Sequence, residues 1–154
     1  MPITHDQDSG DALTLIEAAL SQWGEAERIG TAFNPRIAEY LATCGLGPSD
    51  EQPWCGAFMT FLASRCGITP PLLPAVARSW LTVGHPVTDP KIGDIVVLGR
   101  GERWEGHVGL LVRFINERTE ILILGGNQAD RVGVAPFNVD KVIGYRRLTD
   151  TGRT

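Results

Sequence analysis

Residues 52–59 read Gln-Pro-Trp-Cys-Gly-Ala-Phe-Met and place a cysteine at the predicted start of a helix. Pro53 suits the first turn of a helix, because its missing N–H is one that the helix cannot pair and its φ is already near the helical value. Cys55 is therefore expected in the first turn of an amphipathic helix, where unpaired N–H groups and the helix dipole stabilise a thiolate. A cysteine in this setting is a candidate nucleophile, and it needs a base from elsewhere in the chain.

The first half of the chain predicts helices on both sides of this cysteine. Apolar residues recur there at three- and four-residue steps, and the segments are bounded by residues typical of helix ends, such as Asn34 at one start and Gly67 at one end. The helix that follows Cys55 is expected to bury one face, with Phe58 and Phe61 on it. The predicted helices cover residues 11–23, 34–44, 55–66 and 77–81.

After Gly84 the pattern changes to short β-branched runs bounded by Gly, Asn and Asp. The turn at residues 116–118 predicts an antiparallel hairpin. Helices first and strands second indicate an α+β fold, in which N-terminal helices pack on a C-terminal antiparallel sheet of about five strands. The predicted strands cover residues 94–98, 107–115, 119–124, 131–134 and 142–145.

The composition of the 154 residues, with 43% hydrophobic and 21% charged, is that of one ordinary globular domain. We expect this domain to span residues 11–148, between a flexible lead at 1–10 and a flexible tail at 149–154. The net charge of −4 and the lack of basic clusters argue against nucleic acid as a partner. No window approaches the roughly 18 consecutive apolar residues of a membrane span. The first ten residues have neither a basic start nor an apolar segment, so we expect no secretory signal peptide.

The other two cysteines, Cys44 and Cys66, have no Cys-x-x-Cys neighbour, so structural zinc is not expected. We interpret them as small buried thiols, with a disulfide between them as the alternative.

His107 is the histidine best placed to be the base. It follows the Gly-rich, charged loop 99–106 and opens an apolar strand, so its ring is expected at the mouth of the strand, accessible to a substrate. Gly106 and Gly109 leave the backbone around it uncrowded. The alternative is a strand-end histidine that only bonds to the loop.

A histidine base is held in one tautomer by a third polar group. If residues 116–118 form a hairpin, the end of the next strand returns to His107 and brings Asn127 with it. Asn127 is therefore the predicted orienting residue, and Gln128 and Asp130 are alternatives for the same role. Asn127 can equally be an ordinary turn residue.

Five segments in this order resemble the CHAP and NlpC-type cysteine peptidases that cut peptidoglycan, especially their small single-domain, phage-type members. The resemblance covers nearly the whole chain, from the first helix to Tyr145. The segments are 54–58 (Trp-Cys-Gly-Ala-Phe), 77–81 (Ala-Arg-Ser-Trp-Leu), 93–97 (Gly-Asp-Ile-Val-Val), 106–109 (Gly-His-Val-Gly) and 124–128 (Leu-Gly-Gly-Asn-Gln).

The resemblance implies a papain-like fold without metal or cofactor, and it assigns Cys55 as nucleophile, His107 as base and Asn127 as orienting residue. Many relatives carry an acidic residue near that third position, where this chain has Gly125 and Gly126. The implied reaction is hydrolysis of a cell-wall amide through a thioester, by an endopeptidase or an N-acetylmuramoyl-L-alanine amidase.

The resemblance also implies a monomer that is made in the cytoplasm and acts on the wall, as a lysin released by a holin or as a secreted effector with an immunity or inhibitor protein as partner. The alternative is an inactive wall-binding module of the same fold.

Several side chains are candidates for binding substrate or for another chemistry. The candidates for the substrate groove are Trp54, Arg78, Ser79, Trp80 and Trp104. The alternative for Trp54 and Trp80 is that they are core residues. Asp94 is expected to fix the turn into the first strand. Glycan cleavage by Glu102 or Glu105 with Asp94 is a remote alternative, because no pattern sets their separation. A Ser79 nucleophile lacks the Gly-x-Ser-x-Gly turn.

Overall fold

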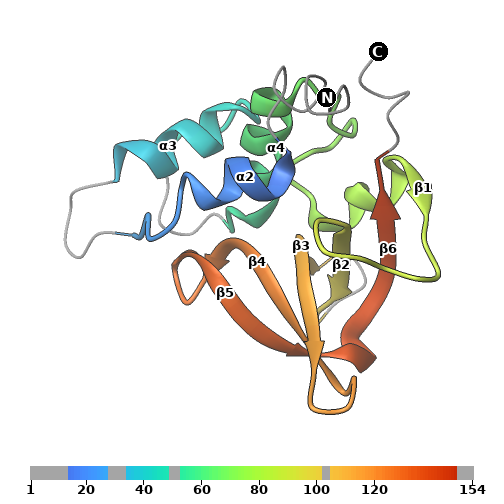
Figure 1. The fold of residues 1–154 in the computed structure, drawn as a ribbon. Coiled ribbons are helices and arrows are strands. Elements are labelled where there is room, and N and C mark those ends of the chain that lie inside the picture. The colour runs from blue at the N-terminus through green and yellow to red at the C-terminus, as the bar shows by residue number, and fades with distance from the viewer. Residues whose placement is uncertain (1–13, 28–33, 49–52, 102–104, 149–154) are drawn as a thin grey trace, which may run out of the picture.

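A computed structural model of the chain describes residues 14–27, 34–48, 53–101 and 105–148 (Figure 1). The predicted lead at 1–10 and tail at 149–154 lie outside these residues. The helices are α2 (Leu15–Leu20), α3 (Pro35–Ala42) and α4 (Cys55–Cys66), with 3-10 helices η1 (Ala77–Thr82) and η2 (Val139–Lys141). The strands are β1 (His85–Pro86), β2 (Ile95–Gly99), β3 (Gly106–Ile115), β4 (Glu120–Gln128), β5 (Arg131–Asn138) and β6 (Val142–Arg147).

The strands form one six-stranded sheet in the order β1-β6-β2-β3-β4-β5, and every neighbouring pair is antiparallel. Figure 1 shows the helices gathered on one side of this sheet, with α4 against β3 and β4. The α+β prediction is therefore confirmed. The five predicted strands are present, and the short β1 adds a sixth by pairing with β6.

The predicted helix boundaries rest on local hydrogen bonds that the structure contains. Asn34 caps α3 by accepting from the N–H of Arg36, and Pro35 is its first residue. Gly67 ends α4 with a φ of 70°, a left-handed conformation that glycine adopts without strain. At the start of α4 the N-cap is Trp54, so Pro53 lies outside the helix and Cys55 is the first helical residue.

The helix α4 is not amphipathic, and the expected single buried face is wrong. Every residue from Cys55 to Ala63 is buried, because the helix lies between the sheet on one side and α2 and α3 on the other. A helix that is apolar all round is typical of such a central position. The nucleophile candidate is thus carried by the most enclosed helix of the described chain.

The sheet is covered on both faces around its centre. Facing the helices, β2 contributes Ile95 and Val97 to the larger core cluster. The alternate residues Val96 and Leu98 belong to a second cluster on the opposite face, as expected for successive side chains of a strand. The second cluster also contains Leu111, Ile121 and Ile123, with Phe114, Phe137, Val139, Val142 and Tyr145 packed against it.

All three cysteines are free thiols, so the alternative of a disulfide between Cys44 and Cys66 is wrong. The Cys44 thiol donates to the Thr60 hydroxyl at 3.5 Å. Cys66 is buried, and this burial raises the pKa of its thiol to about 11.

Candidate active site

Cys55 lies at the first position of α4 with its side chain only 4% exposed. No side chain caps this helix start. The backbone N–H groups of Val108 and Gly56 lie near the sulfur and help to lower the pKa of the thiol. The predicted location of Cys55 in the first turn of a helix is confirmed.

The ring of His107, the second residue of β3, lies close enough to the Cys55 thiol for each group to shift the pKa of the other. The helix and the strand that carry these two residues pack directly against each other. The structure therefore brings together the predicted nucleophile and the predicted base, which are far apart in the sequence.

The surroundings of His107 are tighter than the sequence indicates, because its ring is buried and only 8% exposed. A Cβ on Gly109 would lie 2.4 Å from Cγ2 of Ile123, and one on Gly106 would lie 2.7 Å from the carbonyl oxygen of Leu98. These two glycines allow neighbouring strands to approach closely. The expectation that they leave the backbone around His107 uncrowded for a substrate is therefore wrong.

Cys55 and His107 shift each other's pKa in opposite directions. Burial by itself would raise the pKa of the Cys55 thiol, but the hydrogen bond and charge of His107, with the N–H groups of Val108 and Gly56, lower it overall. Burial would likewise lower the pKa of His107, but the Cys55 thiolate and then Gln128 raise it, against a smaller opposing effect of Arg100. The arrangement favours a thiolate–imidazolium pair.

Gln128 fixes the tautomer of His107. Its Oε1 atom lies 2.9 Å from Nε2 of His107. Its Nε2 group donates to two backbone carbonyls, that of Ile123 at 2.9 Å and that of Gly133 at 2.7 Å. Because both amide hydrogens are used, Oε1 must accept, so Nε2 of His107 must carry a proton. In the neutral ring Nδ1 is then the unprotonated nitrogen, free to take the proton of the Cys55 thiol.

The predicted contact of Asn127 with His107 is replaced by that of Gln128, the alternative noted in the sequence. The pairing of β4 with β5 shifts register between Gly125 and Gln128, and Asn127 has a φ of 60° within this bulge. A bulge breaks the alternation of side chains along the strand, so it is the next residue that faces the base. Asp130, the other alternative, lies in the turn that follows, with a φ of 63°.

Two of the five candidate substrate residues are core residues, because Trp54 and Trp80 are each 1% exposed. The indole of Trp54 donates to Glu27 at 2.8 Å, and that of Trp80 donates to the carbonyl of Pro74 at 3.0 Å. The prediction that they wall a groove is wrong for these two side chains.

Arg78 and Ser79 are partly exposed, and both hold loops in place. Arg78 donates from Nε to the carbonyl of Glu105 at 2.5 Å, across the loop that leads to His107. The Ser79 hydroxyl bonds to the carbonyls of Leu73 and Val76. Trp104 lies outside the described residues.

Asp94, one of the carboxylates considered for glycan cleavage, has a structural role. Asp94 is 5% exposed, and its two oxygens accept from Arg147, each at 2.8 Å. It also accepts from the N–H of Lys91 at 2.7 Å, so the expected role in the turn before β2 is confirmed. Glu102, one of its two proposed partners, lies outside the described residues.

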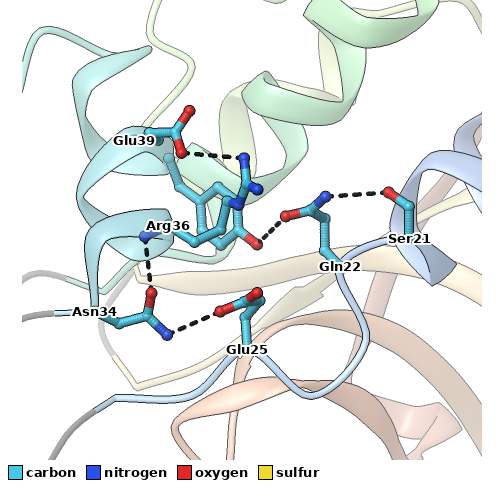
Figure 2. A network of polar contacts seen from close by, with 7 residues as sticks. Ser21, Gln22, Glu25, Asn34, Arg36 and Glu39 are labelled. Atoms are coloured by element: carbon cyan, nitrogen blue, oxygen red, sulfur yellow. Dashed lines mark hydrogen bonds and ion pairs between the residues drawn. The ribbon is translucent and has the colours of Figure 1, made fainter.

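A polar network joins the residues that follow α2 to the start of α3 (Figure 2). Tyr40 donates to Gln22 at 2.8 Å, and Asn34 donates to Glu25 at 2.9 Å. Burial raises the pKa of the Tyr40 hydroxyl. The same segment pairs with the start of β5 through Ala26 and Arg131. Together with the Trp54 to Glu27 bond, this network fixes the backbone just before Cys55.

One neighbour of the base, Phe137, was not predicted from the sequence. The ring of Phe137, in β5, stacks on the ring of His107 with centroids 5.1 Å apart and an interplanar angle of 25°. Alternation predicts that Phe137 shares a face with Ala135 and Gly133. The strand pairing places it opposite Ile121 of β4, so neither the sequence pattern nor the register of β5 indicates its contact with His107.

Comparison of the chain with models of protein families and with curated protein sequences finds no match. Within the ranges that the structure describes, no helix has the length and apolar character needed to cross a membrane. Among the same residues, no group of three or more His, Cys, Asp or Glu side chains is arranged to hold a metal ion.

Proposed function

We propose that the protein is a cysteine hydrolase with a papain-like fold of the CHAP and NlpC type, and that it cleaves an amide bond in peptidoglycan. The observation that carries the proposal is that His107 interacts with Cys55 at the start of a buried helix. The choice of peptidoglycan as substrate rests on the five ordered sequence segments. The enzyme is an endopeptidase or an N-acetylmuramoyl-L-alanine amidase, and it acts as a lysin or a secreted antibacterial effector.

In the proposed reaction, the Cys55 thiolate attacks the amide carbonyl and forms a tetrahedral oxyanion. Backbone N–H groups of the uncapped first turn of α4 are suited to stabilise this oxyanion, as positive ends of helices do. His107, protonated in the pair, gives its Nδ1 proton to the leaving amine. Water then hydrolyses the thioester with His107 as base.

Gln128 is the orienting residue in this mechanism, in place of Asn127. Its acceptor oxygen keeps the proton on Nε2 of His107 and leaves Nδ1 for the exchange with Cys55. A carboxylate is not needed at this position, because the two carbonyls that hold the Gln128 amide already determine its direction. A positioned acid or base, which is the role of His107 here, accelerates such reactions by roughly a hundred- to ten-thousand-fold.

The test uses purified peptidoglycan and mass spectrometry of the soluble products. Wild-type protein and a Cys66→Ala control should release fragments with new amine and carboxyl ends, and Cys55→Ala should release none while remaining folded. Undiminished release by Cys55→Ala would contradict the assignment of the nucleophile. New reducing ends would instead indicate a glycosidase.

The alternative, an inactive wall-binding module, makes a different prediction in the same assay. Such a module would sediment with peptidoglycan and release nothing, in the wild type and in Cys55→Ala alike. Its Cys55 would react with iodoacetamide no faster than an ordinary thiol at neutral pH, whereas a catalytic cysteine reacts faster.

A further inference from the structure

The aromatic ring of Phe137 covers one face of the His107 imidazole. The two rings are nearly parallel, with 25° between their planes and 5.1 Å between their centroids, which is the separation of an offset stack. The Phe137 side chain is itself held in place, because it is partly buried against the second core cluster of the sheet. The contact is therefore made by a supported ring.

The stacking restrains the imidazole in a direction that its hydrogen bonds leave open. The bond to Gln128 acts on Nε2 of the ring, and Cys55 interacts with the ring from α4. Hydrogen bonds to imidazole nitrogens are directed near the plane of the ring. They resist sliding of the ring within that plane, but they resist tilting out of it only weakly. A flat aromatic surface against the face of the ring opposes this tilt, and it also keeps water from that face.

The stacking also bears on the charge of the ring. A cation over the face of an aromatic ring, within about 6 Å of its centroid, is attracted by the negative face of the ring. The charged groups that act on His107 are Cys55 from α4, which favours the imidazolium, and Arg100 after β2, which opposes it. The aromatic face of Phe137, like Cys55, therefore favours the charged imidazolium form of His107.

We infer that Phe137 is a positioning residue, which holds the His107 ring in line with Cys55 and Gln128 and stabilises the thiolate–imidazolium pair through its aromatic face. The inference deepens the proposed function, because it assumes that this pair is the reactive form. It adds a neighbour from β5 to a site formed by α4, β3 and β4.

The test measures the rate at which iodoacetamide alkylates Cys55 as a function of pH, by mass spectrometry of the peptide that contains Cys55. In Phe137→Leu the rise of this rate should move to higher pH, so that the rate at a pH on the wild-type rise falls roughly threefold. Phe137→Tyr, which keeps the ring, should retain the wild-type profile. Phe137→Met serves as a second non-aromatic variant if the leucine variant does not fold.

Phe114→Leu is the matched control. Phe114 is a partly buried aromatic residue of the same cluster, and it contacts Tyr145 and Arg118 rather than His107. The inference is overturned if a folded Phe137→Leu or Phe137→Met variant keeps the wild-type profile, if Phe114→Leu shifts it as much, or if Phe137→Tyr fails to restore it. Iodoacetamide needs no peptidoglycan, so a failure of the hydrolase proposal in the wall assay would be recognised separately.

Discussion

A Cβ atom on Gly125 would lie 2.8 Å from Oε1 of Gln128, the atom that accepts from His107. The end of the Gln128 side chain thus occupies the space that any larger residue at position 125 would fill. Glycine is required here by the packing of the site, since Gly125 is not among the positions with a positive φ.

Gly125→Ala should therefore move the Gln128 amide away from His107 and leave the backbone in place, because the atom it meets is the end of a flexible side chain. Losing a hydrogen bond to a charged group costs about 1.5–3 kcal/mol, so we expect peptidoglycan hydrolysis to fall roughly ten- to a hundredfold. Gly133→Ala is the control, because a Cβ there meets nothing closer than the Arg131 side chain at 3.9 Å. Equal rates in the two variants would show that Gln128 does not orient the base.

Gly126→Ala should lower the free energy of unfolding, whereas Gly125→Ala should mainly lower the rate of hydrolysis. A Cβ on Gly126 would lie 2.7 Å from Cβ of Phe58 and 2.9 Å from Cζ3 of Trp54, both in the rigid core. Overpacking of this kind costs about 1–3 kcal/mol in the free energy of unfolding. Urea denaturation followed by circular dichroism measures it, and a free energy of unfolding equal to that of Gly133→Ala would contradict the packing described here.

Substitutions of Gln128 should separate orientation of the base from stability. Gln128→Glu keeps an oxygen acceptor for His107, but an ionised carboxylate cannot donate to the carbonyls of Ile123 and Gly133. Gln128→Leu removes the acceptor as well. We expect both variants to unfold at a lower temperature, since two buried carbonyls lose their donors, at about 1–3 kcal/mol for each.

The hydrolysis rates of these variants should differ. The glutamate variant should keep the larger share of activity, and the leucine variant should lose roughly ten- to a hundredfold. Thermal denaturation and the wall assay on the same preparations give both values. A leucine variant that hydrolyses peptidoglycan as fast as the glutamate variant would rule out the orienting role.

The pH dependence follows from the opposite shifts at Cys55 and His107. The pKa of Cys55 is lowered, so its alkylation should rise to a plateau at a lower pH than that of an ordinary thiol. Hydrolysis should rise with it and fall again as the pH passes the raised pKa of His107, because the leaving amine then finds no proton donor. Cys66, whose pKa is about 11, should remain unlabelled across this range. Labelling of Cys55 in step with Cys66 would refute the ion pair.

Much of the fold could be predicted because its signals are local. The cap of α3 depends on Asn34 and Pro35, and the hairpin between β3 and β4 depends on the turn at Asn116, where three successive residues have a positive φ. The pairing of Cys55 with His107 needed only the correct order of helix and strands in addition. The cap and the hairpin turn are set by neighbouring residues, whereas the Cys55–His107 pair also needs α4 to pack against β3.

The errors arose where distant parts of the chain determine the outcome. The bulge after Gly125 moves Gln128 into the place expected for Asn127. The alternation of residues before a bulge does not predict where the bulge will occur. Trp54 was a groove candidate because it adjoins Cys55, and Trp80 because it follows the polar residues Arg78 and Ser79. Both indoles instead bond inside the protein, to Glu27 and to the carbonyl of Pro74.

The surroundings of His107 come from a single hairpin. Within β4 and β5 lie Gln128, the Gly133 carbonyl that holds it and the Phe137 ring, joined by a two-residue turn in which Ala129 and Asp130 both have a positive φ. A residue gained or lost inside this hairpin would displace all three contacts at once. In evolution, these three contacts around His107 would therefore be kept or lost together. The nucleophile Cys55 belongs to α4 and can change independently of the hairpin.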